Sequence, residues 1–138
     1  MDTRANIVNS MILSLRRCTN RNKYVLLLNE LLSLFPMHAE KSLKLCLKSK
    51  IKKYTLIKEK RPAKDYSLYP ICGNNQKYLV FQNFCSCFYF KEKVLCNDTD
   101  VMCKHILSVL LAESFKNYVN IFLDSSLFFE WFMKKLRT

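Results

Sequence analysis

Cys85-Ser-Cys87 is followed, fifteen residues later, by Cys103-Lys-His105, and these two short motifs constrain fold and function more than any other part of the chain. Three thiolates and one imidazole form a common ligand set for structural zinc, which takes four protein ligands in a tetrahedron. A single residue between two ligands lets both side chains turn towards one ion, and the spacer is long enough to return the second pair. The motifs therefore predict a closed, structural zinc site made by Cys85, Cys87, Cys103 and His105.

The remaining cysteines and the second histidine allow alternative assignments of the metal ligands. The chain has seven cysteines, so the thiols could also lie in the core or at the surface without binding metal. Cys96 lies within the spacer and could compete as a ligand, although its spacing to Cys103 suits the site poorly. His38 is expected at the surface, and Lys104 is expected to offset the charge of about −1 on a zinc ion with three thiolates. Free cysteines among apolar neighbours usually pack as small core residues. These are Cys18, Cys46 and Cys72.

The composition is that of one globular domain in a reducing compartment. The chain has 138 residues, half of them hydrophobic, which is enough to bury one modest core. No stretch reaches the roughly 20 apolar residues of a membrane-spanning helix. The N-terminus has no apolar run ending in a cleavage site, so we expect no signal peptide. Cysteines in such a protein are expected to be free or metal-bound rather than paired in disulfides.

Positive charge is concentrated in one segment. The net charge is +12, and residues 41–64 contain ten basic residues against one acid, Glu59. Such a block could contact nucleic-acid phosphates with a salt-dependent affinity, because binding releases counterions. A solvated surface that keeps the protein soluble is the alternative. The candidate nucleic-acid-binding residues are Lys48, Lys50, Lys52, Lys53, Lys58, Lys60, Arg61 and Lys64.

The sequence argues against several common enzyme classes. Gly73 is the only glycine, whereas a phosphate-binding loop needs two glycines and a dinucleotide-binding fingerprint needs three. A zinc hydrolase or deaminase would need an open metal position and a glutamate placed as general base. Four protein ligands and the lack of a His-x-Glu motif argue against both. No catalytic residue is predicted, and we expect the chain not to be an enzyme.

Hydrophobic periodicity and turn residues predict an α+β fold. Apolar residues three and four positions apart indicate helices, and runs of β-forming residues indicate strands. Helices are predicted over 4–17, 23–35 and 37–48. Strands are predicted over 51–58, 66–72 and 77–84, with a loop over 60–65 and a turn at 73–75. A further helix is predicted from Cys103, capped by Asp98, Thr99 or Asp100.

These elements are expected to form a single domain, 1–138, with four successive parts. They are a helical N-terminal part (1–50), a small antiparallel three-stranded meander (51–84), the zinc-binding segment (85–115) and an apolar C-terminal helix (116–138). That last helix, with Asp124 or Ser125 as its cap, is apolar on nearly every side, so part of it is expected to bind a partner. Use of the whole helix in the chain's own core is the alternative. The candidate partner-binding residues are Phe128, Phe129, Trp131 and Phe132.

The two motifs in their context resemble the SWIM-type zinc finger family. That family has C-x-C, a variable spacer and C-x-H at the start of a hydrophobic helix. Here the corresponding stretches are Phe84-Cys-Ser-Cys-Phe88 and Met102-Cys-Lys-His-Ile-Leu-Ser-Val-Leu-Leu111. Chain length, and the layout from about Tyr24 to Leu111, are similar to the short SWIM-domain subunits of Shu complexes.

The resemblance implies a nuclear, non-enzymatic zinc-binding adaptor of homologous recombination. Such a protein would pair with a RecA-like recombinase paralogue, which would hold the ATPase chemistry. Together they would promote assembly or stability of recombinase filaments on single-stranded DNA, in DNA repair or meiosis. The alternative is a stand-alone basic zinc module that binds nucleic acid through residues 41–64.

Overall fold

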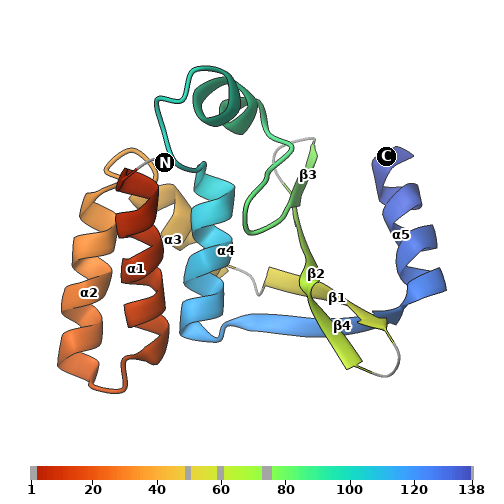
Figure 1. Ribbon diagram of the computed structural model, residues 1–138, viewed down its shortest axis with the longest axis horizontal. Coiled ribbons are helices and arrows are strands. Elements are labelled where there is room, and N and C mark those ends of the chain that lie inside the picture. Colours follow the sequence, from red (N-terminus) through yellow and green to blue (C-terminus); the bar gives the residue numbers. More distant parts are fainter. Residues whose placement is uncertain (1–2, 49–50, 59–60, 73–75, 138) are drawn as a thin grey trace.

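The computed structural model describes residues 3–48, 51–58, 61–72 and 76–137, and its architecture is α+β, as the sequence predicts (Figure 1). Helices α1, α2 and α3 lie on one side, a sheet lies on the other, and α4 stands between them. The elements are α1 (Thr3–Arg17), α2 (Arg21–Ser33), α3 (Ala39–Lys48), β1 (Ile51–Lys58), β2 (Arg61–Cys72), β3 (Lys77–Val80), the π-helical segment η1 (Phe90–Cys96), α4 (Lys104–Phe115), β4 (Tyr118–Asp124) and α5 (Ser125–Arg137).

The three N-terminal helices agree with the predicted helices to within a few residues. α1 buries Val8, Ile12 and Leu15, which lie three or four positions apart and so share one face. α2 begins after Asn20, whose side-chain oxygen accepts hydrogen bonds from the next turn. α1 packs against α2, and both α1 and α3 pack against α4. The helical layer thus forms one wall of the core.

Helix α4 is the centre of the core. All eight residues from His105 to Ala112 are buried, so this helix has no solvent-facing side over two turns. Ser42 of α3 donates a hydrogen bond of 2.9 Å to the carbonyl oxygen of Lys104 and ties the start of α4 to the helical layer. The helix ends at Lys116, which takes the left-handed conformation that commonly closes helices. The predicted caps are wrong, because Cys103 occupies the N-cap position without a side-chain cap bond.

The sheet has four strands in the order β3-β2-β1-β4, where an antiparallel three-stranded meander was expected. β1 pairs antiparallel with β2 and β2 pairs antiparallel with β3. β1 also pairs along its other side with β4, in parallel and in register from Ile51 opposite Tyr118 to Ile57 opposite Asp124. The sheet is therefore mixed, and its fourth strand comes from the segment that the sequence assigned to a C-terminal helix.

Two boundaries in the middle of the chain also differ from expectation. β2 begins at Arg61, so most of the predicted loop over 60–65 is strand; residue 60 and the turn at 73–75 lie outside the described residues. Pro62 is tolerated there because it lies opposite Ile57, next to a register shift in β1. β3 ends at Val80 rather than at 84. An isolated antiparallel bridge then pairs Val80 with Cys85.

The C-terminal part consists of β4 followed by α5. Asp124 caps α5 as predicted, since its Oδ1 accepts hydrogen bonds from the backbone of Leu127 and the hydroxyl of Ser126. α5 lies on the far side of the sheet from α1 and α2 (Figure 1). It is attached there by Trp131, whose ring stacks on Tyr54 of β1 with centroids 4.1 Å apart. Among the described residues, no helix combines the length and apolar character needed to cross a bilayer.

Replacement of Leu107 tests the central place of α4. Leu107 is 0% exposed, so Leu107→Ala should leave a cavity and lower the free energy of unfolding by about 3 kcal/mol. Leu26→Ala is the matched control, because Leu26 on α2 is 64% exposed and its loss should change stability by less than about 0.5 kcal/mol. Urea unfolding followed by circular dichroism measures both, and equal effects would contradict the packing described here.

Candidate metal centre

The four predicted ligands come from two places that the fold brings together. After β3 the chain makes a tight reversal in which the backbone N–H of Phe81 donates to the oxygen of Phe84 at 2.7 Å. The N–H of Ser86 then donates to Leu79 at 3.1 Å, so Cys85 and Cys87 lie on a loop pinned to the strand. The second pair lies at the start of α4, with Cys103 at the N-cap and His105 in the first turn.

The donor atoms form a compact, buried cluster. The three sulfur atoms and one ring nitrogen all lie within 4.8 Å of one another, and all four residues are buried. The Nδ1 of His105 is 3.6 Å from the Sγ of Cys85 and 3.9 Å from the Sγ of Cys103. Zinc bonds of about 2.3 Å to sulfur and about 2.0–2.1 Å to nitrogen give a tetrahedral edge of roughly 3.6 Å. The cluster therefore fits one tetrahedral metal ion, with Nδ1 as the imidazole ligand.

Burial and mutual hydrogen bonds set the protonation of these thiols before a metal binds. The hydrogen bonds of Cys85 with Cys103 and Cys87 raise its pKa, and burial raises it further. The hydrogen bond from Cys85 favours the thiolate of Cys103, but the bond to Cys87 and burial outweigh it and raise the pKa to about 11. The pKa of Cys87 is lowered, because it accepts hydrogen bonds from the other two thiols. Metal binding would thus displace thiol protons.

Groups around the ligands hold them in place. The backbone N–H of Phe90 donates to the Sγ of Cys87 at 3.4 Å, a contact that favours a thiolate. The ring of Tyr78 on β3 packs over the ring of His105 with centroids 4.4 Å apart and fixes its plane. Both contacts restrict ligand orientation, which is the usual role of groups just outside a metal site.

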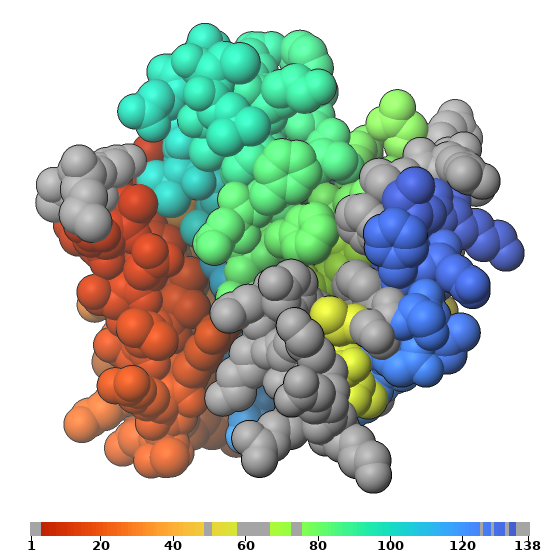
Figure 2. All heavy atoms as spheres, turned by 45° about the vertical axis from the view of Figure 1, so that its right-hand side comes forward, coloured from red at the N-terminus to blue at the C-terminus, as the bar shows by residue number. Residues whose placement is uncertain are grey.

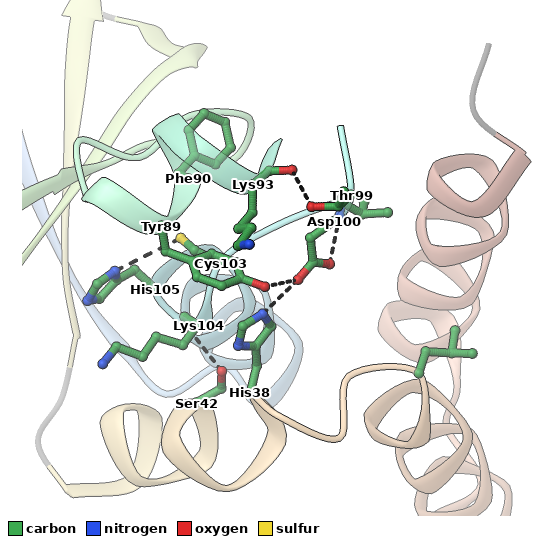
Figure 3. Close-up of polar contacts among 12 residues, drawn as sticks. His38, Ser42, Tyr89, Phe90, Lys93, Thr99, Asp100, Cys103, Lys104 and His105 are labelled. Carbon is green, nitrogen blue, oxygen red and sulfur yellow. Dashed lines mark hydrogen bonds and ion pairs between the residues drawn. The ribbon is translucent and has the colours of Figure 1, made fainter. Parts of the chain in front are cut away.

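Asp100 organises a polar cluster beside the metal centre that no sequence motif predicts (Figure 3). Its Oδ2 accepts hydrogen bonds from the hydroxyl of Tyr89 at 2.5 Å and from the Nε2 of His38 at 2.9 Å. Its Oδ1 accepts the backbone N–H of Val101 at 2.8 Å and lies 3.8 Å from the guanidinium of Arg4. The carboxylate thus joins the spacer loop to α1 and to the corner before α3. No linear spacing links these residues, so only the fold reveals them.

His38 is buried within this cluster, so the expectation of a surface position is wrong. It is not part of the metal cluster found among the described residues. Burial tends to raise the pKa of the Asp100 carboxyl, but the hydrogen bonds from Tyr89, His38 and Val101 outweigh it and the pKa is lowered. Those hydrogen bonds favour the carboxylate, so Asp100 is charged at neutral pH.

Of the eight predicted nucleic-acid-binding residues, only Lys48, Lys52 and Lys53 have side chains that the structure describes. Lys53 is 20% exposed, and its Nζ lies 2.7 Å from the Oε1 of Glu113 on α4. The same oxygen accepts a hydrogen bond from Tyr69, and the Lys53 ammonium also lies over the ring of Tyr118. Lys53 thus connects β1 to α4. Lys48 and Lys52 are exposed, Lys50 and Lys60 lie outside the described residues, and the side chains of Lys58, Arg61 and Lys64 lie outside them too.

The candidate partner residues and the other cysteines have separate positions. Phe129 is 65% exposed and Trp131 is half-buried against Tyr54, while the side chains of Phe128 and Phe132 lie outside the described residues. Of the predicted core cysteines, Cys46 is buried and Cys18 is half-buried. Cys72 is exposed, which contradicts the expectation, and so is Cys96 in the spacer.

Comparisons of the chain with protein-family models, curated proteins and solved structures found no match.

The donor cluster predicts one tightly bound zinc ion per chain. Replacing a ligand in Cys103→Ser should weaken zinc binding by more than about 100-fold, because the described residues place no fifth donor in the cluster. Cys96→Ser is the matched control and should bind zinc like the wild type, since Cys96 lies outside the cluster. Metal analysis and the absorption spectrum of the cobalt-substituted protein report both results. Full zinc content in Cys103→Ser would contradict the assigned ligand set.

The Asp100 cluster predicts a stability difference that depends on pH. A lowered folded pKa adds stability above the unfolded value of about 3.9, and this stability is lost as pH falls through the folded pKa. Asp100→Asn should therefore cost about 2 kcal/mol at pH 7 and progressively less below about pH 4. Asp98→Asn is the control, because Asp98 is exposed and asparagine tolerates its positive φ. A constant difference across the whole pH range, measured by denaturant unfolding, would disprove the electrostatic explanation.

Proposed function

We propose that the chain is a non-enzymatic, zinc-containing adaptor that acts in homologous recombination by pairing with a RecA-like recombinase paralogue. The observation that carries the proposal is the closed donor cluster, formed by C-x-C after a strand and C-x-H at the start of a buried helix. This local arrangement agrees with the resemblance to SWIM-type zinc fingers. The proposed site of action is the nucleus.

The cluster supports a structural rather than a catalytic metal. Four buried protein donors complete a tetrahedron and leave no position for an activated water. Zinc, when bound, would supply four bonds that hold the loop after β3 against the first turn of α4. The chain's own residues then orient those ligands, through Tyr78 on the imidazole and the Phe90 amide on a thiolate.

The C-terminal part supports partner binding. Apolar side chains on β4 and α5 are exposed, and α5 packs against the sheet with Trp131 stacked on Tyr54. Exposed aromatic and methionine side chains are enriched at the centres of protein interfaces. In this proposal the paralogue would contribute ATP-dependent chemistry, and the pair would promote recombinase filament assembly or stability on single-stranded DNA. The exposed apolar side chains are Val119, Phe122, Leu127, Phe129 and Met133.

A stand-alone nucleic-acid-binding module is the second candidate. It is favoured by the net charge of +12 and by the exposure of Lys48 and Lys52. The internal pairing of Lys53 with Glu113 reduces its value as a phosphate contact. Filter binding of the isolated chain to single-stranded DNA, with an affinity that falls steeply as salt rises, would support this candidate.

Co-expression tests the adaptor proposal directly. The wild-type chain, produced with each RecA-like paralogue encoded in the same genome, should form a soluble heterodimer with one of them. Cys85→Ser should lose zinc and reduce the recovered heterodimer at least about tenfold, because the start of α4 is no longer held. Cys96→Ser, an exposed cysteine outside the cluster, should form the heterodimer normally. Size-exclusion chromatography with light scattering provides the measurement, and a wild-type monomer with every paralogue would refute the adaptor role.

A further inference from the structure

The two edges of the sheet differ in how their backbone groups are paired. The outer edge of β3 is covered by the loop that carries Cys85. On that edge the N–H of Leu79 donates to the hydroxyl of Ser86, the N–H of Ser86 donates back to Leu79, and Val80 forms a bridge with Cys85. Leu79 and Val80 are therefore paired within the chain on this side, whereas β3 pairs with β2 only over residues 69–72 and no described strand pairs with the same side of β2 over 61–68.

The opposite edge is β4, and no described strand pairs with its outer side. Its seven residues span roughly 23 Å. An edge strand presents backbone N–H and C=O groups that can pair with another chain, and proteins usually protect such edges with lysine, proline, bulges or short length. Residues 118–123, Tyr-Val-Asn-Ile-Phe-Leu, contain no charge and no proline. The pairing of β4 with β1 also runs through all seven residues without a bulge.

Exposed apolar side chains on β4 support the idea that a further strand could join the sheet at this edge. Val119 is 41% exposed and Phe122 is 50% exposed, although the two point to opposite faces of the strand. Figure 2 shows β4 and α5, in blue, at the surface beside β1. An added strand would cover apolar groups on both faces while its backbone pairs with the open edge.

Charge favours a partner of opposite sign over a second copy of the chain. Each copy carries a net charge of +12, so two copies repel. The beginning of β4 is also locally basic, because exposed Lys116 precedes the strand and exposed Lys52 lies opposite Val119 in the parallel register. An acidic residue near the start of an added strand would lie at this locally basic end of β4.

We propose that the outer edge of β4 binds an extended, acidic strand of the partner protein, which becomes the fifth strand of the sheet. Backbone hydrogen bonds would provide affinity and the Lys52–Lys116 pair would set register and direction. This inference rests on the adaptor role proposed above, because it states how the recombinase paralogue is held.

Hydrogen–deuterium exchange of the isolated chain and of the purified heterodimer tests the assignment. The outward-facing amides within residues 118–124, which pair with no described strand, should gain at least about tenfold protection in the heterodimer. A heterodimer in which β4 exchanges as in the free chain would overturn strand addition and leave the adaptor role intact. Failure of the wild type to form any heterodimer would overturn both proposals.

Charge reversal tests the partner's chemistry. Lys52→Glu combined with Lys116→Glu should weaken the heterodimer about tenfold at low salt, and the difference should shrink as salt rises. Lys91→Glu is the control, because Lys91 is equally exposed but lies on the η1 segment. If Lys91→Glu weakened the heterodimer as much as the double substitution does, the proposal that the added strand is acidic would be overturned. Dimerisation of the isolated chain, seen by sedimentation velocity with protection of β4, would assign the edge to a second copy and overturn the partner assignment.

Discussion

The burial of α4 over residues 105–112 is the constraint on which the rest of the structure depends. A helix with eight consecutive buried residues must be covered on every side, and here α1 and α3 cover one side while the sheet and the ligand-bearing loop cover the other. Both ends carry polar groups that need partners inside the protein. His105 at the start faces the three thiols, and Glu113 near the end takes bonds from Lys53 and Tyr69. The metal centre and the ion pair are therefore two solutions to the same burial problem.

The features that could be predicted from the sequence are those determined by residue spacing within a short segment or by shared metal ligation. The spacing of apolar residues such as Val8, Ile12 and Leu15 predicted the first helix, and the spacing of the two motifs predicted the donor cluster. Chelation made the last prediction strong, because four ligands for one ion must meet wherever the intervening chain runs.

The parts that could not be predicted depend on contacts between distant residues. β4 is stabilised as a strand by its parallel pairing with β1, and its apolar sequence alone fits a helix equally well. Pro62 on its own indicates a loop, and its place in a strand is explained by the register shift in β1 next to its partner Ile57. Asp100 reads as a helix cap, yet its partners His38 and Tyr89 lie on other segments. In each case tertiary context decides between local alternatives of similar free energy.

The same helix also links the metal centre to the open sheet edge. α4 spans roughly 18 Å from Lys104 to Phe115, and Lys116 then reverses the chain in a left-handed conformation. The side-chain amide of Asn117 donates a 3.0 Å hydrogen bond to the carbonyl of Cys46 at the end of α3. The start of β4 is therefore positioned by α4 and α3 as well as by its pairing with β1. A metal ion that fixes the first turn of α4 would thus help to position an edge strand at the other end of the helix, without touching it. In the proposed adaptor, this geometric coupling would let a structural metal site influence recognition on a distant surface.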